Sequence, residues 1–103
     1  MRILVISQYF YPENFRINDL CLGLKEKGHD ITVVTGKPNY PKGNFFSSYS
    51  FLNKPVEKYK GIKVYRSPII PRGNATGLNL FLNYISFVFF GSIKLFFIKE
   101  KFD

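Results

Sequence analysis

Apolar and polar positions in residues 1–36 predict a β-strand, an α-helix and a second β-strand, in that order. Residues 3–6 form an uninterrupted apolar run, typical of a strand buried on both faces of a parallel sheet. Residues 31–35 repeat this pattern, so the two strands and the helix between them form one βαβ unit. The helix, over residues 15–27, is expected to end at Gly28 and to bury an apolar stripe formed by Ile17, Leu20, Cys21 and Leu24.

The middle of the chain has weaker periodicity. Residues 37–60 contain several prolines and no sustained pattern, which predicts a long loop. A loop of that length is uncommon in a small domain unless it binds something or closes over a site. Residues 62–66 alternate between apolar and polar side chains, which predicts a third strand with one exposed face, followed by a second loop over residues 67–77.

Residues 78–99 predict one long helix that is apolar nearly all round. Three environments remain open for it: burial against the sheet, association with a membrane surface, or a membrane span. Its narrow polar stripe, interrupted by Phe90, consists of Asn79, Asn83, Ser86 and Lys94. The side chains expected to face a membrane are Phe81, Phe89, Phe90, Phe96 and Phe97.

Composition narrows the class of protein. The chain is 46% hydrophobic and 18% aromatic, which is ample for a folded core. Its net charge of +8 indicates an anionic partner such as phosphate, nucleic acid or a membrane, and residues 36–75 hold eight basic residues against Glu57 alone. A single cysteine, Cys21, permits no disulfide within the chain and fits a reducing, cytoplasmic compartment. No secretory signal is expected at the start of the chain.

The turn after the first strand, residues 8–14, lies where open α/β sheets bind ligands. It contains no glycine, so the dinucleotide-binding and Walker fingerprints are absent from it. No metal-ligand spacing is present, and we expect no metal or cofactor. Glu13, Asn14 and Arg16 surround the predicted helix start, where they could hold hydroxyls or a phosphate. The alternative is structural, with Asn14 capping the helix and Glu13 favouring its dipole.

Several of these segments together resemble the N-terminal domain of family 4 retaining glycosyltransferases, of the bacterial colanic-acid and O-antigen type. The segments are Arg2–Ser7 followed by Gln8–Phe10, Pro12–Glu13, Gly28–Asp30 and Pro38–Pro41 with Gly43. The resemblance implies the GT-B fold, which has two Rossmann-like domains. Residues 1–103 would then be the N-terminal part of the acceptor-side domain, an α/β unit with a parallel sheet, without the C-terminal donor-binding domain.

The resemblance also implies a reaction. The full-length enzyme would move a sugar from a nucleotide-sugar donor to a lipid-linked saccharide acceptor during cell-surface polysaccharide biosynthesis, at the inner face of the cell membrane. This part alone is expected to transfer no sugar. None of its residues is expected to be catalytic, and the expected acceptor-binding residues are Glu13, Asn14, Arg16, Asn39 and Tyr40.

Two other classes of protein fit parts of the pattern. A small basic membrane-associated interaction protein would explain the long aromatic helix. A basic nucleic-acid-binding α/β module would explain the net charge of +8. The basic residues lie in proline-rich loops without a recognisable nucleic-acid-binding motif, so no nucleic acid is expected among the partners. The expected partners are the nucleotide sugar, the lipid-linked acceptor, an anionic membrane surface and the missing C-terminal domain.

Overall fold

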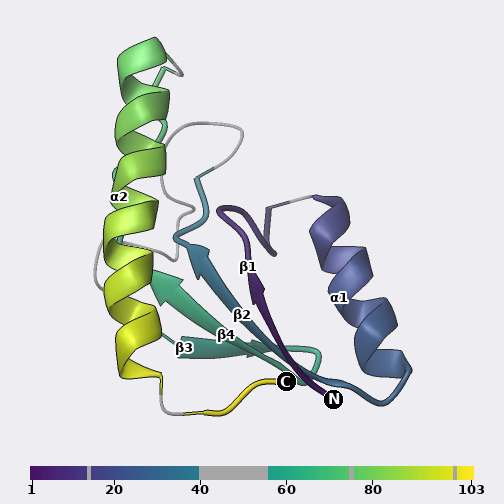
Figure 1. Cartoon of the computed structure of the whole chain (residues 1–103). Helices are drawn as coiled ribbons and strands as arrows, with labels where there is room; N and C mark the ends of the chain where they lie inside the picture. Colours follow the sequence, from purple (N-terminus) through teal and green to yellow (C-terminus); the bar gives the residue numbers. More distant parts are fainter. Residues whose placement is uncertain (14, 40–55, 75, 99) are drawn as a thin grey trace.

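The structure is a computed structural model that describes residues 1–13, 15–39, 56–74, 76–98 and 100–103. These residues form an α/β fold with one mixed sheet and two helices (Figure 1). The elements are β1 (Arg2–Ile6), α1 (Arg16–Glu26), β2 (Asp30–Gly36), β3 (Val56–Tyr59), β4 (Ile62–Ser67) and α2 (Gly77–Phe97). In the sheet order β1-β2-β4-β3, the first three strands are parallel and β3 runs antiparallel to β4.

The predicted βαβ unit is confirmed. β1 and β2 pair in parallel from Arg2 opposite Asp30 to Ile6 opposite Val34, and α1 connects them. Gly28 follows α1 with a φ of 94°, a conformation that glycine adopts readily because it has no Cβ. The helix begins later than expected, after Phe15, which makes no side-chain capping hydrogen bond. The residue expected to cap it, Asn14, lies outside the described residues.

The prediction of a loop throughout residues 37–60 is wrong, because β3 occupies Val56–Tyr59. The sheet is consequently mixed rather than entirely parallel. A tight turn sets this hairpin: Lys60 and Gly61 both have positive φ, 48° and 86°. Such turns match the twist of an antiparallel pair, so even a four-residue strand with little apolar pattern can form there. Residues 40–55 lie outside the described residues.

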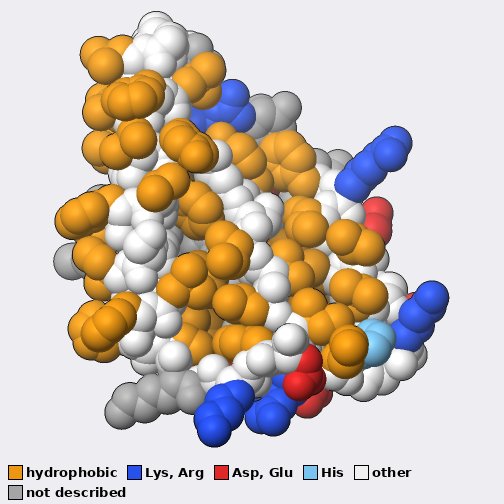
Figure 2. Space-filling model, viewed as in Figure 1, with side chains coloured by type: hydrophobic (Ala, Val, Ile, Leu, Met, Phe, Trp, Pro, Cys, Tyr) orange, Lys and Arg blue, Asp and Glu red, His pale blue; other side chains and the backbone are white. Residues whose placement is uncertain are grey.

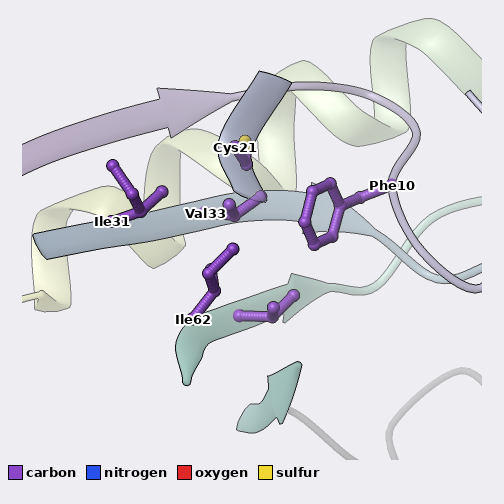
Figure 3. Close-up of a cluster of buried hydrophobic side chains, with 6 residues drawn as sticks. Phe10, Cys21, Ile31, Val33 and Ile62 are labelled. Atoms are coloured by element: carbon purple, nitrogen blue, oxygen red, sulfur yellow. The ribbon is translucent and has the colours of Figure 1, made fainter. Parts of the chain in front are cut away.

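A hydrophobic core fills the space between α1 and the sheet. It contains Phe10, Cys21, Ile31, Val33, Ile62 and Val64, most of which are labelled in Figure 3. Ile17 and Leu24 pack against this core as expected, but Leu20 is 56% exposed and lies outside it. The inward position belongs instead to Asn18, whose side-chain amide donates to the Glu13 carbonyl oxygen at 2.7 Å. This hydrogen bond favours a helix rotation that leaves Leu20 outside.

Strand β1 is less buried than its apolar run predicted. Its residues are partly buried or exposed, and Ile6 is 54% exposed. Ile3 and Val5 pack against the core, whereas α2, on the other face, contacts mainly β2 and β4 and leaves the side of β1 that carries Ile6 largely uncovered. The expectation of a strand buried on both faces is therefore wrong for the residues described.

Helix α2 packs against β2 and β4 on the face opposite α1, and it is visible behind the sheet in Figure 3. Its buried residues are Asn83, Ser86, Phe87 and Gly91. Most of its large apolar side chains point outward, where Figure 2 shows hydrophobic atoms along the length of the helix. α2 therefore turns two of its few polar residues toward the protein. Among the described residues, it is the one helix long and apolar enough to cross a membrane.

Candidate functional site

The loops that follow β1, β2 and β4 meet at the carboxyl end of the sheet, because these three strands are parallel. The first half of α2 extends beyond this end of the sheet and lies beside the loops (Figure 1). Ligands of open α/β sheets bind at this end. The polar side chains gathered here, called the loop cluster below, are Gln8, Tyr9, Glu13, Asn39, Arg72 and Asn83.

Glu13 is the buried centre of the loop cluster, with 1% of its surface exposed. One carboxylate oxygen accepts the backbone N–H of Phe10 at 3.3 Å, and the other accepts that of Asn39 at 3.0 Å. Hydrogen bonds of this kind compensate for part of the desolvation of a buried carboxylate. The structure thus brings together two predicted site residues, Glu13 and Asn39. The Glu13 carboxylate connects the loop after β1 to the loop after β2 by hydrogen bonds.

Asn39 extends this network to the loop after β4. Its side-chain oxygen accepts the backbone N–H of Arg72 at 2.8 Å, while its side-chain nitrogen donates to the Lys37 carbonyl at 3.1 Å. The Arg72 guanidinium carbon lies 5.6 Å from the centre of the Tyr9 ring, a favourable cation–π position. Arg72 is therefore fixed through both its backbone and its side chain.

The polar residues of α2 fasten the helix to the same loops. Tyr9 donates its hydroxyl to the Asn83 side-chain oxygen at 3.1 Å, and the Gln8 amide donates to that same oxygen. Asn83 in turn donates to the Ile70 carbonyl at 2.7 Å, and Ser86 accepts the Ile70 N–H at 2.8 Å. These bonds explain why Asn83 and Ser86 of the polar stripe face inward, since buried polar groups need partners.

Arg66, near the end of β4, connects several segments by hydrogen bonds of its guanidinium. Its side chain is fully buried and pairs with Glu57 of β3 at 2.8 Å. The same guanidinium donates to the Gly36 carbonyl at 3.1 Å and to the Tyr11 carbonyl. One planar cation thus links the loop after β1, the end of β2 and the β3 strand, using several of its five N–H donors.

The remaining predicted site residues are not brought into the loop cluster. Arg16 is an exposed residue at the start of α1, and it makes no hydrogen bond or ion pair with the cluster residues that the structure describes. Asn14 and Tyr40 lie outside the described residues. Of the five phenylalanines expected to face a membrane, four are well exposed and Phe90 is half-buried; the exposed ones are Phe81, Phe89, Phe96 and Phe97.

Sequence reasoning missed four members of the loop cluster: Gln8, Tyr9, Arg72 and Asn83. The position of Gln8 and Tyr9 directly after the first strand was a usable signal, because that position meets the carboxyl end of the sheet. The sequence shows Asn83 as a polar residue of an apolar helix, but it gives no sign of the partners that Asn83 meets in the loops. For Arg72 the sequence offers only its place between Pro71 and Gly73, which indicates a turn.

A second polar group lies at the opposite, amino end of the sheet. Glu100 accepts from Lys63 at 2.6 Å, from the Tyr65 hydroxyl at 3.0 Å and from Thr32 at 3.3 Å. The hydrogen bond from Lys63 is the main reason why the pKa of Glu100 is lowered, and it likewise raises the pKa of Lys63. Burial is the first cause of the raised pKa of Tyr65. A cavity of about 190 Å³ adjoins this group.

The described residues contain no group of three or more His, Cys, Asp or Glu side chains that could hold a metal ion. The polar chemistry in the loop cluster therefore comes from amides, a phenol, a carboxylate and a guanidinium. Such groups bind hydroxyls and anions by hydrogen bonding. Comparisons of the chain with known protein families, with curated proteins and with solved structures give no match.

Proposed function

We propose that this chain is the acceptor-side part of a retaining glycosyltransferase of GT-B fold, with a Rossmann-like sheet. One observation carries the proposal: the hydrogen-bonded series Glu13, Asn39 and Arg72 lies at the carboxyl end of the parallel strands, beside a helix with an apolar outer face. A polar site next to a lipid-compatible surface suits an acceptor that joins a sugar to a lipid through phosphate.

The reaction would move a sugar from a nucleotide sugar to this lipid-linked acceptor. Retaining transfer of this kind depends on positioning the substrates and stabilising the leaving group, so no residue of the chain is assigned a catalytic role. Side-chain amides at the site, such as that of Gln8, suit sugar hydroxyls, and a guanidinium suits a phosphate. Most contacts to the donor are assigned to a C-terminal domain. The nucleotide sugar is a substrate, and no cofactor is assigned to the reaction.

Helix α2 is assigned to the membrane surface at the cytoplasmic side. Its outward phenylalanines, such as Phe89 and Phe96, are 60% and 84% exposed, and the chain carries a net charge of +8. Apolar aromatic side chains combined with basic residues favour binding to the interface of an anionic bilayer. The same exposed face supports the second candidate, a small membrane-associated interaction protein without enzymatic activity.

The test is an assay of sugar transfer to membrane lipid. A polypeptide that carries residues 1–103 together with a donor-binding domain is incubated with labelled nucleotide sugars and polyprenyl-diphosphate saccharides. We expect labelled lipid product, and we expect none from residues 1–103 alone. Membrane binding without transfer by the longer polypeptide, across the donor sugars tried, would support the interaction protein instead.

A further inference from the structure

We infer that Arg72 binds the phosphate of a polyprenyl-linked lipid, while the hydrocarbon chain of that lipid lies on the outward face of α2. This inference rests on the proposed function and names the part of the acceptor that the loop cluster recognises. It also differs from the sequence-based expectation, in which Arg16 is one of the acceptor-binding residues and Arg72 is not.

Arg72 is held in place before any ligand arrives. Its backbone N–H donates to Asn39 at 2.8 Å, and its guanidinium lies over the Tyr9 ring. The next residue, Gly73, has a φ of 56°, and a Cβ at that position would come within 2.8 Å of the Asn79 side chain. The chain therefore turns tightly between Arg72 and α2, which restricts where the guanidinium can lie. A pre-positioned side chain loses less conformational entropy on binding.

The surroundings of Arg72 suit a lipid phosphate in particular. Ile70 is 42% exposed on one side, and Leu78 and Phe81, in the first turns of α2, are 68% and 58% exposed. The N-terminal turn of α2 has no acidic residue, so the positive end of its helix dipole is not offset there. A guanidinium can bind phosphate through two parallel hydrogen bonds. A cation is thus placed at the beginning of an apolar helix face.

Other cations are less well placed for this role. Arg16 is exposed at the start of α1, on the opposite face of the sheet from α2. Arg2, Lys25, Lys58 and Lys63 surround the cavity at the amino end of the sheet. Within the loop cluster as defined above, Arg72 is the cation: its backbone is held by the hydrogen bond to Asn39, and its guanidinium lies over the Tyr9 ring.

The experiment measures binding of the chain to two kinds of phosphatidylcholine vesicle with equal surface charge. One kind contains polyprenyl phosphate and the other contains phosphatidylglycerol. We expect the wild type to prefer polyprenyl phosphate and Arg72→Gln to lose that preference by about tenfold or more. Arg72→Lys should recover part of it, because charge remains while the two-pronged geometry is lost. Lys27→Gln, which removes an exposed charge beyond α1, should keep the preference.

The inference is overturned if Arg72→Gln keeps the preference, if it weakens binding to both vesicles by the same factor, or if Arg16→Gln alone abolishes the preference. Competition by inorganic phosphate as effective as that by polyprenyl phosphate would also overturn it, since the site would then recognise free phosphate. Thermal unfolding of each variant confirms that it is folded. Absence of sugar transfer by the longer polypeptide, with Arg72-dependent binding intact, would contradict the proposed reaction and not this site.

Discussion

The carboxylate of Glu13 accepts the backbone N–H of Asn39 at 3.0 Å, although 26 positions separate the two residues. Both residues are buried, and the same carboxylate also accepts the N–H of Phe10. A single buried side chain thus accepts hydrogen bonds from the backbones of two loops that follow different strands. The geometry of the loop cluster therefore depends on Glu13, whose side chain is almost completely shielded from solvent.

Glu13→Gln should destabilise the fold by about 1 to 3 kcal/mol, because the amide nitrogen is a donor and would face one of the two backbone N–H groups. Urea unfolding followed by circular dichroism measures this loss. Glu26→Gln, at an exposed position at the end of α1, is the matched control and should change stability little. Equal effects of the two substitutions would mean that the carboxylate does not bridge the loops.

Leu24→Ala should cost about 2 to 5 kcal/mol, because Leu24 packs against the core beneath α1. Leu20→Ala makes the same chemical change on the same helix at a position that is 56% exposed, and it should cost far less. The difference between the two unfolding free energies tests the rotation of α1. A loss below about 0.5 kcal/mol for Leu24→Ala would contradict the register assigned here.

Membrane attachment through α2 predicts a distinct fractionation. Protein at the membrane surface should be released by high salt or by alkaline carbonate, whereas a membrane span would resist both treatments. Replacing Phe89 and Phe96 by serine should shift the protein to the soluble fraction. Leu20→Ser, which removes an exposed apolar side chain from α1, serves as the control. Fully soluble wild-type protein at low salt would rule out the assignment of α2 to the membrane.

The Glu100 group predicts a pH-dependent contact at the amino end of the sheet. Because the pKa of Glu100 is lowered mainly by the hydrogen bond from Lys63, its contribution holds above the ordinary carboxyl pKa. That contribution is lost as the pH falls through the lowered value. Lys63 has a raised pKa, so its contribution is lost only in strongly alkaline solution. The contact should therefore persist at neutral pH and open in acid.

Nuclear magnetic resonance can follow this transition through the Tyr65 ring signals during an acid titration. Glu100→Gln should remove the acid transition while leaving the ring signals near their open positions at all pH values. Because Lys63 and Glu100 are partly exposed, the effect on global stability should be small. An unchanged acid transition in Glu100→Gln would assign it to another carboxyl group.

The apolar pattern was sufficient to predict the βαβ unit and the long second helix, since the length and period of apolar runs indicate strands and helices even where many of the side chains stay exposed. It could not predict β3, because a four-residue strand is fixed by the turn at Lys60 and Gly61 rather than by its own sequence. The apolar pattern also could not predict which side of α2 packs against the sheet. The partners that turn Asn83 inward, Tyr9 and Ile70, lie in distant loops.

The candidate site was predictable only in part for the same reason. Glu13 and Asn39 were expected to lie together, and they do. Arg72 contributes through a backbone contact with a residue 33 positions away, and such contacts leave no local pattern in a sequence. Arg16 was selected because of its place near a helix start. A helix start alone does not determine which way a neighbouring cation points.

The last residue of the chain lies against the outer edge of β1. The backbone N–H of Asp103 donates to the Arg2 carbonyl at 2.8 Å, and the Asp103 carboxylate accepts the Arg2 N–H at 2.7 Å. In a parallel ladder alternate residues direct their backbone groups to the same side, so Leu4 and Ile6 offer the next bonding positions along that edge. A strand that continues from Asp103 would begin next to Arg2 of β1. The chain between β1 and this strand would already have brought its two ends together. Addition of the strand would be a rapid, local zipping step rather than a search between distant segments.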